Sequence, residues 1–395
     1  MEYRPYYLAK EWVKLGHKVT IIAASFSHLR MREPLIGKSL QSEMIDGIKY
    51  TWIKVPAYYS STRRILNILF FVFRLRYYSK RLSNIVKPDV VIASSTYPLD
   101  IYPAINIAKR TGAKLCYEVH DIWPLSPMVI GGYSRHHPFI AIMQMAENKA
   151  CKNCDKLISL LWNSESHFRE HGLVEGKFAC VPNGFNCEEW TTEKLSLRLP
   201  FEHENLFNEL KSKGNLIVGF AGGFAASGSL NTLIDAAIIL KDDVQISFVL
   251  VGDGMKKTEL LNMVRDNKLN NVFFLPPVRK ELIPALESHF DIAFYGGVHS
   301  VLHKYGTSAN KLTDYMFSSK PIVQSVDEPG SLVESIGCGI RVEAENPHEV
   351  AKAIMKIANM SEEERIKMGE NGRKYAFDNL EYGVLAKNFL NYIFD

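Results

Sequence analysis

The sequence predicts an α/β protein built from two doubly wound domains, and three observations support this class. Short apolar runs rich in β-branched residues alternate with helical segments along the chain. The alternation stops at a polar stretch, residues 191–214, and then begins again. The chain has 395 residues, which is too many for one ordinary core and suits two domains of roughly 100–200 residues each.

Each series of apolar runs predicts a parallel sheet, because runs that are apolar on both faces are typical of buried parallel strands. The first series lies at residues 17–24, 89–93, 114–119 and 156–160, and the second at 216–221, 246–251, 272–275, 292–294 and 321–323. We therefore expect an N-terminal domain over 1–190, a linker over 191–214, a C-terminal domain over 215–380 and a final helix over 381–395 that crosses back to the first domain. Ligands of such sheets bind outside the carboxyl ends of the strands, so we expect the site in a cleft that the two domains face.

The beginning of the chain is unusual for a doubly wound domain. A helix is predicted directly after Met1 and ends near His17, whereas such a domain normally begins with a strand and a glycine-rich turn. Either the first strand of this domain is missing, or Met1 is an internal methionine taken as the start.

Composition excludes several other classes. The net charge of +4 is mild and does not indicate a nucleic-acid partner. We expect the six cysteines to be reduced, buried thiols, and the C-x-x-C at Cys151 and Cys154 has no second pair at zinc-finger spacing. No signal peptide begins the sequence, and no run of about 20 apolar residues could span a bilayer. These features predict a cytoplasmic protein without a metal site.

Residues 305–316 combine a glycine loop with the start of a helix that carries a cation and then a carboxylate. A helix N-terminus presents unpaired N–H groups and the positive end of a dipole, which can hold a diphosphate. Asp314, one turn into the helix, can accept two hydrogen bonds from a ribose diol. An ordinary loop and helix cap is the alternative interpretation.

Other turns of the second domain offer similar groups where strands end. Gly222 and Gly223 follow one strand, Lys256 follows the next, and Lys280 follows a third. Paired glycines let a backbone approach a phosphate closely, although such loops are common and the lysines can be merely solvated. The Asn183-Gly184 turn needs no function to explain it. The predicted donor-binding set is Asn183, Gly222, Gly223, Lys256, Lys280, Gly306, Thr307, Ser308, Ala309, Asn310, Lys311, Leu312 and Asp314.

His120 and Asp121 follow a predicted strand of the first domain and are the candidate catalytic residues. A histidine at this place can hydrogen-bond a sugar hydroxyl, and a neighbouring carboxylate can orient it. A structural turn that packs Trp123 is the alternative.

Residues 63–82 form a predicted helix with six cations, no acidic residue and many aromatic side chains. Such a helix can lie in the headgroup layer of a membrane, where each cation contributes about 1 kcal/mol near an anionic surface. The predicted membrane contacts are Arg63, Arg64, Phe70, Phe71, Arg74 and Arg76. A core helix with a basic outer face is the alternative.

Six segments carry a resemblance to a known family: residues 4–9, 118–124, 181–184, 251–254, 308–316 and 368–373. They resemble family 4 glycosyltransferases of bacterial surface-polysaccharide assembly, of the N-acetyl-L-fucosamine transferase type. The seven residues between Gly306 and Asp314 are similar to the Glu-x7-Glu signature of retaining members. The resemblance implies a GT-B fold, a nucleotide-sugar donor in the C-terminal domain, retention of anomeric configuration and no essential metal.

Three departures from the family pattern stand out. The first strand and its glycine loop are missing, and Gly306 replaces the first glutamate of the signature. The arginine and lysine that many members use to clamp the diphosphate fall on Gly223 and Gly228. By elimination, Lys311, Lys256 or Lys280 must offset the phosphate charge.

The resemblance therefore predicts a retaining hexosyl- or N-acetylhexosaminyltransferase. It would move a sugar from a UDP-sugar to a polyprenyl-diphosphate-linked saccharide at the inner face of the cytoplasmic membrane, in O-antigen or capsule biosynthesis, with no cofactor. The choice of UDP over GDP rests on the resemblance alone. Amides of 306–309 with Lys311 would hold the diphosphate, and His120 would contact the donor sugar.

Two alternatives remain open at this point. An inactive or truncated nucleotide-binding or membrane-scaffold protein would explain the missing first strand. A UDP-sugar 2-epimerase shares the fold, but it should bring a cluster of carboxylates to the cleft and should lack the basic aromatic helix, and the sequence shows the reverse.

Overall fold

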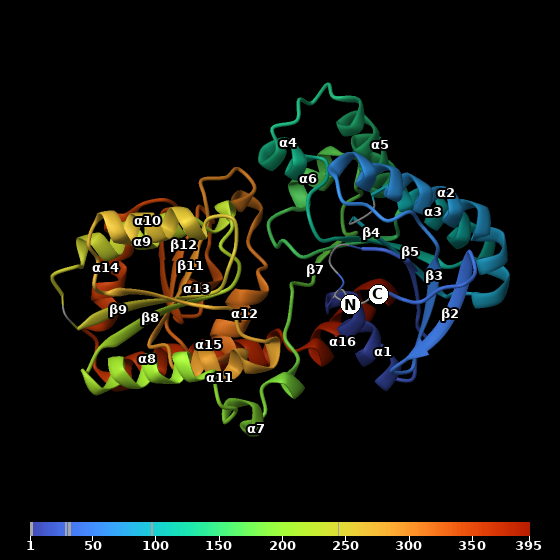
Figure 1. Cartoon of the computed structure of the whole chain (residues 1–395). Helices are drawn as coiled ribbons and strands as arrows, with labels where there is room; N and C mark the ends of the chain where they lie inside the picture. The colour runs from blue at the N-terminus through green and yellow to red at the C-terminus, as the bar shows by residue number, and fades with distance from the viewer. Residues whose placement is uncertain (1–2, 28–29, 31–32, 96–97, 244) are drawn as a thin grey trace. The chain divides into compact units, whose positions relative to one another are not determined.

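The computed structural model describes residues 3–27, 30, 33–95, 98–243 and 245–395 and divides them into two compact units (Figure 1). Unit 1 comprises Met1–Pro182 together with Tyr382–Asp395, and unit 2 comprises Asn183–Glu381. Each unit has its own sheets and its own core, as the alternation of apolar runs predicts.

Unit 2 is a doubly wound domain on one parallel sheet. Its strands lie in the order β10-β9-β8-β11-β12-β13, and every pair is parallel. Their bounds are β8 Leu216–Ala221, β9 Ile246–Val251, β10 Val272–Leu275, β11 Ile292–Gly296, β12 Ile322–Ser325 and β13 Gly339–Val342. The strand order changes direction between β8 and β11, which is the topological switch point where such sheets bind ligands.

Helices cover both faces of this sheet, and Figure 1 shows the two layers. One layer consists of α9 Leu230–Ile239, α10 Lys257–Asp266 and α14 Pro347–Ala358. The other consists of α8 Phe201–Ser212, α11 Ile283–Ser288, α12 Asn310–Phe317, α13 Leu332–Ser335 and α15 Glu362–Asn379. Since both faces are covered, every residue of β9 is buried.

The sequence predictions for unit 2 hold for five strands and differ at two places. The edge strand β13 was not predicted, because it is short and its apolar run is interrupted by Arg341. Residues 191–214, expected to be a linker, contain α7 Thr192–Leu195 and α8 and belong to unit 2. Phe207 and Leu210 are three positions apart and are buried against the sheet. Because polar residues surround them, the helical spacing of these apolar residues was not recognised in the sequence.

Unit 1 contains two sheets. The first has the order β1-β3-β2 and the second the order β4-β5-β6-β7. Their strands are β1 Thr20–Ala24, β2 Leu40–Ile45, β3 Ile48–Ile53, β4 Val90–Ser94, β5 Lys114–Val119, β6 Lys156–Ser159 and β7 Phe178–Cys180. Among the described strands of unit 1, only β2 pairs antiparallel, through the turn at Asp46 and Gly47, which both adopt positive φ. Asp-Gly is a strong hairpin signal, and the sequence interpretation missed it.

The helices of unit 1 are α1 Tyr3–Lys14, α2 Ser61–Val86, α3 Ile101–Thr111, α4 Leu125–Gly131, α5 Pro138–Asn153, α6 Glu165–Glu170 and α16 Tyr382–Phe394. The last of these packs against the first: Trp12 Nε1 donates to the Ala386 carbonyl over 3.0 Å, and the Tyr7 and Tyr382 rings stack 5.0 Å apart. The C-terminal helix is thus part of the core of unit 1.

Helix α1 is the first described element, so no strand precedes it among the described residues. One face of α1 packs with the β4–β7 sheet through Leu8 and Trp12, and another packs with β3 through Ala9. Among the described strands, β1 and β4 are edge strands of two separate sheets, and each has a neighbour on one side only.

Candidate donor site and its relatives

The loops after β8 and β9 interlock at the carboxyl edge of the unit 2 sheet. Phe224 N donates to Asp253 O over 2.8 Å, and Lys256 N donates back to Phe224 O over 3.1 Å. Gly252, at φ +156°, lies so close to the neighbouring loop that a Cβ there would sit 1.9 Å from Gly222 O. Both the conformation and the space require glycine, whereas a Cβ on Gly223 would approach nothing closer than 4.0 Å.

Gly306 provides the backbone turn into α12. It adopts φ +102°, and its amide donates to His303 O over 3.0 Å. The next amide, that of Thr307, donates over 2.7 Å to the buried carboxylate of Glu328, which also accepts from Gln324. Two of the four amides predicted to hold a diphosphate are therefore engaged within the protein.

The following amides are available. In the part of the chain that the structure describes, the N–H groups of Ser308, Ala309, Asn310 and Lys311 donate to no protein group, and Ala309 at the N-cap has no side-chain cap. Four unpaired donors at the positive end of a helix dipole are an arrangement to which an anion can bind. The free amides lie two residues further along the chain than the sequence predicts.

Asn183 braces this loop from the start of unit 2. Its amide N–H donates to Ser308 Oγ over 2.7 Å, and its side-chain Nδ2 donates to Ser308 O over 2.6 Å. The predicted donor-side residue Asn183 therefore fixes the position of Ser308 in this structure.

Lys311 lies where the glycine loop meets α12. Its Nζ is 3.6 Å from the centroid of the Phe220 ring, and a Cβ on Gly222 would approach it to 2.5 Å. Burial lowers the pKa of Lys311 to about 8, against the opposing effect of Glu287 and Asp314. Of the three lysines proposed to offset the phosphate charge, Lys311 is the one that belongs to the same segment as the free amides.

The other two lysines are paired with carboxylates. Lys256 Nζ lies 2.6 Å from Glu259 on the same exposed surface, and Lys280 Nζ lies 2.7 Å from Glu189. Leu312 also departs from its predicted role, because its side chain is buried in the core and its amide donates to Ala309 O. Helical register turns residue 312 toward the sheet and leaves Lys311 at the loop.

Asp314 lies one turn into α12 in a secluded position. Burial raises the pKa of Asp314 to about 7, although Lys280 and Lys311 act in the opposite direction. Burial, and after it the charge of Asp314, raises the pKa of Glu287 well above its usual range. The sequence interpretation missed Glu287, since nothing in the helical segment around it distinguishes it from a surface glutamate.

In unit 1, the carboxylate that contacts His120 is Glu118. His120 Nε2 lies 3.0 Å from Glu118 Oε2, while Asp121, the predicted partner, is exposed. The backbone after β5 is held by Ser95, whose Oγ accepts from the His120 amide over 2.8 Å. Glu118 is the last residue but one of β5 and lies two positions before His120.

Arg4 forms an ion pair with Glu118. Its Nε donates to Glu118 Oε1 over 2.8 Å, and its terminal nitrogens donate to the carbonyls of Val181 and Pro182. Burial alone would raise the pKa of Glu118, but His120 and Arg4 together lower it to about 2. Arg4, Glu118 and His120 thus form one charged network, of which the sequence interpretation identified only the histidine as a functional residue.

Helix α2 presents an outward face of cations and apolar side chains. Arg63, Arg64, Phe70 and Arg76 are exposed there, together with Leu66, Leu69, Phe73 and Tyr77. Phe71 was wrongly predicted as a membrane contact: it is 4% exposed and packs with Ala24 and Ile53, because the helical period turns it inward. The Arg74 guanidinium donates to the Lys54 carbonyl and lies over the Phe70 ring.

No helix in the described parts of the chain combines the length and the apolar character that crossing a membrane requires. The six cysteines are free, and burial raises the pKa of the Cys154 thiol to about 12.

Comparison with known families assigns the two halves of the chain. The model described as "Glycosyltransferase Family 4" matches residues 1–189, and the one described as "Glycosyl transferases group 1" matches residues 215–360. The chain belongs to the family 4 glycosyltransferases, which have the GT-B fold.

One curated relative is an uncharacterised glycosyltransferase of Methanocaldococcus jannaschii, 28% identical over 175 residues, or 44% of this chain. The aligned part spans about half of that relative's length, 46%.

Solved structures share the fold at low identity. Anabaena HepE, in complex with UDP and glucose, has a TM-score of 0.62 and 17% identity over 88% of this chain and 86% of its own. Sucrose-phosphate synthase of Thermosynechococcus elongatus has a TM-score of 0.70 and 14% identity over 97% of this chain and 90% of its own. These likenesses confirm the predicted GT-B architecture.

Proposed function

We propose that this chain is a retaining glycosyltransferase that transfers an N-acetylated sugar from a UDP-sugar to a lipid-linked saccharide in surface-polysaccharide biosynthesis. The observation that carries the proposal is the start of α12, where four free amides, Lys311 and Asp314 lie within residues 308–314. HepE, which shares the fold, was solved with UDP and with UDP-glucose, and this supports UDP as the nucleotide.

The groups at α12 match the parts of a nucleoside diphosphate. The amides of residues 308–311 and the Lys311 ammonium would hold the two phosphates, and the Asp314 carboxyl would accept hydrogen bonds from the ribose diol. Since these donors are fixed before the reaction, they would stabilise the charge that develops on the leaving diphosphate.

Retention then needs no enzymic nucleophile. The bond between the anomeric carbon and the β-phosphate oxygen breaks, and the acceptor oxygen forms its bond on the same face of the sugar. The proton of the acceptor hydroxyl passes to the departing phosphate oxygen. In unit 1, we propose that His120, which Glu118 contacts, forms a hydrogen bond with a hydroxyl of the donor sugar.

Calorimetry with UDP and GDP, without added metal, tests the donor site. We expect UDP to bind the full chain, and Asp314→Ala to weaken it by about 2 kcal/mol, the effect of losing hydrogen bonds to a charged group. Asp266→Ala, which removes an exposed carboxylate of the same unit, is the matched control and should bind as the unchanged protein does. If neither nucleotide binds, this chain is an inactive form and the transferase proposal fails for it.

A donor assay distinguishes the transferase from the epimerase alternative. Incubation with a UDP-sugar and no acceptor, followed by NMR of the anomeric and C2 protons, should leave the sugar configuration unchanged. Conversion to the C2 epimer would contradict the transferase proposal and support the epimerase alternative.

The argument for a lipid-linked acceptor comes from the outward face of α2. Cations and exposed aromatic side chains without any acidic residue favour an anionic membrane surface. We expect the protein to sediment with vesicles containing phosphatidylglycerol, and Arg63→Gln/Arg76→Gln to reduce this binding about thirtyfold, since each of the two cations contributes about 1 kcal/mol. Lys352→Gln/Lys356→Gln on α14 removes equal charge and should have little effect; equal losses in both variants would contradict a contact through α2.

A further inference from the structure

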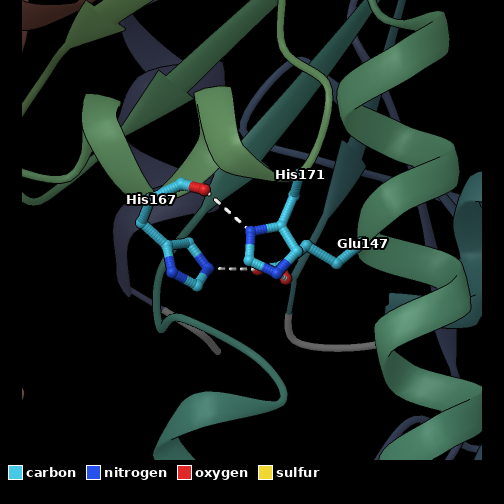
Figure 2. Close-up of side chains that lie close together, drawn as sticks. All are labelled: Glu147, His167 and His171. Atoms are coloured by element: carbon cyan, nitrogen blue, oxygen red, sulfur yellow. Dashed lines mark hydrogen bonds and ion pairs between the residues drawn. The ribbon is translucent and has the colours of Figure 1, made fainter.

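A buried carboxylate and two imidazoles meet between α5 and α6 of unit 1. Glu147 lies in the middle of α5, and His167 and His171 lie one turn apart, on α6 and at its end (Figure 2). His167 Nε2 is 3.0 Å from Glu147 Oε1, and His171 Nε2 is 3.7 Å from Glu147 Oε2. One candidate ligand atom from each side chain lies within 4.8 Å of the others.

These spacings suit a metal ion once the three side chains move closer together. Ligand atoms about 2.0–2.1 Å from a tetrahedral Zn²⁺ are about 3.3 Å from one another. The distances of 3.0 Å and 3.7 Å end on different oxygens of Glu147, and one atom of each side chain lies within 4.8 Å of the others, so an ion would draw the three ligand atoms together. Figure 2 shows the two imidazole rings beside the carboxylate of Glu147, which comes from a different helix.

The tautomer of His171 is set by its backbone contact. Its Nδ1 lies 2.7 Å from the His167 carbonyl, which can only accept, so Nδ1 carries the proton. In the neutral ring Nε2 then carries a lone pair, and it is this nitrogen that faces Glu147. A histidine that donates its other ring nitrogen to a carbonyl is the usual arrangement around a bound metal. Glu147 is oriented in the same way, since Gln144 Nε2 donates to its Oε2 over 2.7 Å.

Charge also favours a cation at this point. Glu147 is 1% exposed, and among the described residues it forms ion pairs with the two histidines and with no lysine or arginine. With neutral imidazoles its negative charge is buried without compensation, which is costly. A divalent ion would supply the missing charge and replace the contacts between the three side chains.

We propose that Glu147, His167 and His171 form a binding site for a divalent transition-metal ion, of the zinc type that imidazole ligands prefer. The ion would clip α5 to α6, and the partly exposed side of His171 would leave its fourth position to water. The site belongs to unit 1 and is independent of the donor site proposed in unit 2. His-x3-His at 167–171 is its only trace in the sequence, where no metal was predicted.

Metal titration of the chelator-treated, full-length protein tests the proposal. Co²⁺ and Zn²⁺ are the probes, followed by calorimetry and by the visible absorption of Co²⁺. We expect one ion per chain, a visible spectrum of nitrogen and oxygen ligands without a thiolate charge-transfer band, and an increase of Tm with Zn²⁺.

Variants then assign the ligands. His171→Asn and Glu147→Gln should each weaken the metal at least tenfold, the lower limit for losing even an outer-shell partner, and should abolish the Tm increase. The exposed His136→Asn and the double variant Cys151→Ser/Cys154→Ser are controls that should bind as the unchanged protein does.

Two results would overturn the site. No binding by a folded protein would mean that a proton, shared in a histidine–glutamate pair, occupies the cluster. Binding that is lost in the cysteine variant but kept in His171→Asn would place the ion elsewhere. Because His171 is partly exposed, its variant should fold even if Glu147→Gln does not.

Discussion

Glu118 in unit 1 and Asp314 in unit 2 are both secluded carboxyl groups, yet their pKa values move in opposite directions. Burial raises the pKa of each group, but Arg4 and His120 contact Glu118 directly and bring its pKa down to about 2. Within the described part of the chain Asp314 has no such contact, and the charges of Lys280 and Lys311 only moderate an increase of its pKa to about 7. Glu118 is therefore a permanent anion that fixes its neighbours, while Asp314 can change its charge near neutral pH.

The two regions also differ in the groups that build them. The network in unit 1 consists of side chains that satisfy one another. The donor edge in unit 2 is shaped by backbone, through glycines in close contact and amides that the protein leaves free. Free donors and raised carboxyl pKa values are expected where a ligand completes the structure.

Removing the partner of Glu118 should have the largest effect. Arg4→Met removes the arginine that pairs with the buried carboxylate of Glu118 and should reduce the free energy of unfolding of unit 1 by about 3–5 kcal/mol. Urea unfolding followed by tryptophan fluorescence measures this, because Trp12, Trp52, Trp123 and Trp162 belong to unit 1. The double variant Arg4→Met/Glu118→Gln should recover part of the loss; a single-variant loss below about 1 kcal/mol would show that Arg4 is not the anchor.

Changing the glycine contact should have the next largest effect. Gly252→Ala places a Cβ 1.9 Å from Gly222 O at φ +156°, and we expect unit 2 to lose about 2–3 kcal/mol through backbone strain and clash. Gly223→Ala, in the adjacent loop but with open space, is the control and should fold with unchanged stability. Hydrogen exchange of the β8 and β9 amides reports on this unit alone, and equal protection in both variants would be evidence against the tight contact.

The smallest expected effect concerns the pH dependence of unit 2. The folded protein retains the Asp314 proton up to a pH of about 7, whereas the unfolded chain releases it near the ordinary value of 3.8. The folded state therefore binds more protons in this window, and the free energy of unfolding falls as the pH rises through it. Asp314→Asn should remove that fall and stabilise unit 2 by about 1–3 kcal/mol above pH 7.

Unfolding of unit 2 measured from pH 4 to pH 8 checks the sign. The curves for the unchanged protein and for Asp314→Asn should converge at the acidic end and separate toward neutrality. Parallel curves would mean that Asp314 titrates at its ordinary pKa. A stabilising substitution that also weakens nucleotide binding would identify Asp314 as a functional group kept at a cost in stability.

The sequence was sufficient for the features that depend on local pattern. Continuous apolar runs predict buried strands such as β8 and β9, and a glycine loop before Lys311 and Asp314 predicts a helix terminus. Features that depend on which way a side chain turns were not predictable in the same manner. Phe70 and Phe71 are adjacent and chemically alike, but one is exposed and the other is in the core.

Contacts between residues far apart in the sequence also could not be predicted from local pattern. Arg4 meets Glu118 across 114 positions, and Glu287 reaches the surroundings of Asp314 from another helix. The same holds for Glu147 and His167, which come from separate helices. Nothing in the sequence pairs these residues with one another, because only the fold brings their side chains together.

The most direct test of the central claim is a crystal structure of the full chain with UDP. The account predicts phosphate oxygens within hydrogen-bond distance of the amides of residues 308–311 and of Lys311 Nζ, and ribose hydroxyls on the Asp314 carboxyl. UDP bound away from the start of α12, or bound there without contacts to these amides, would contradict it.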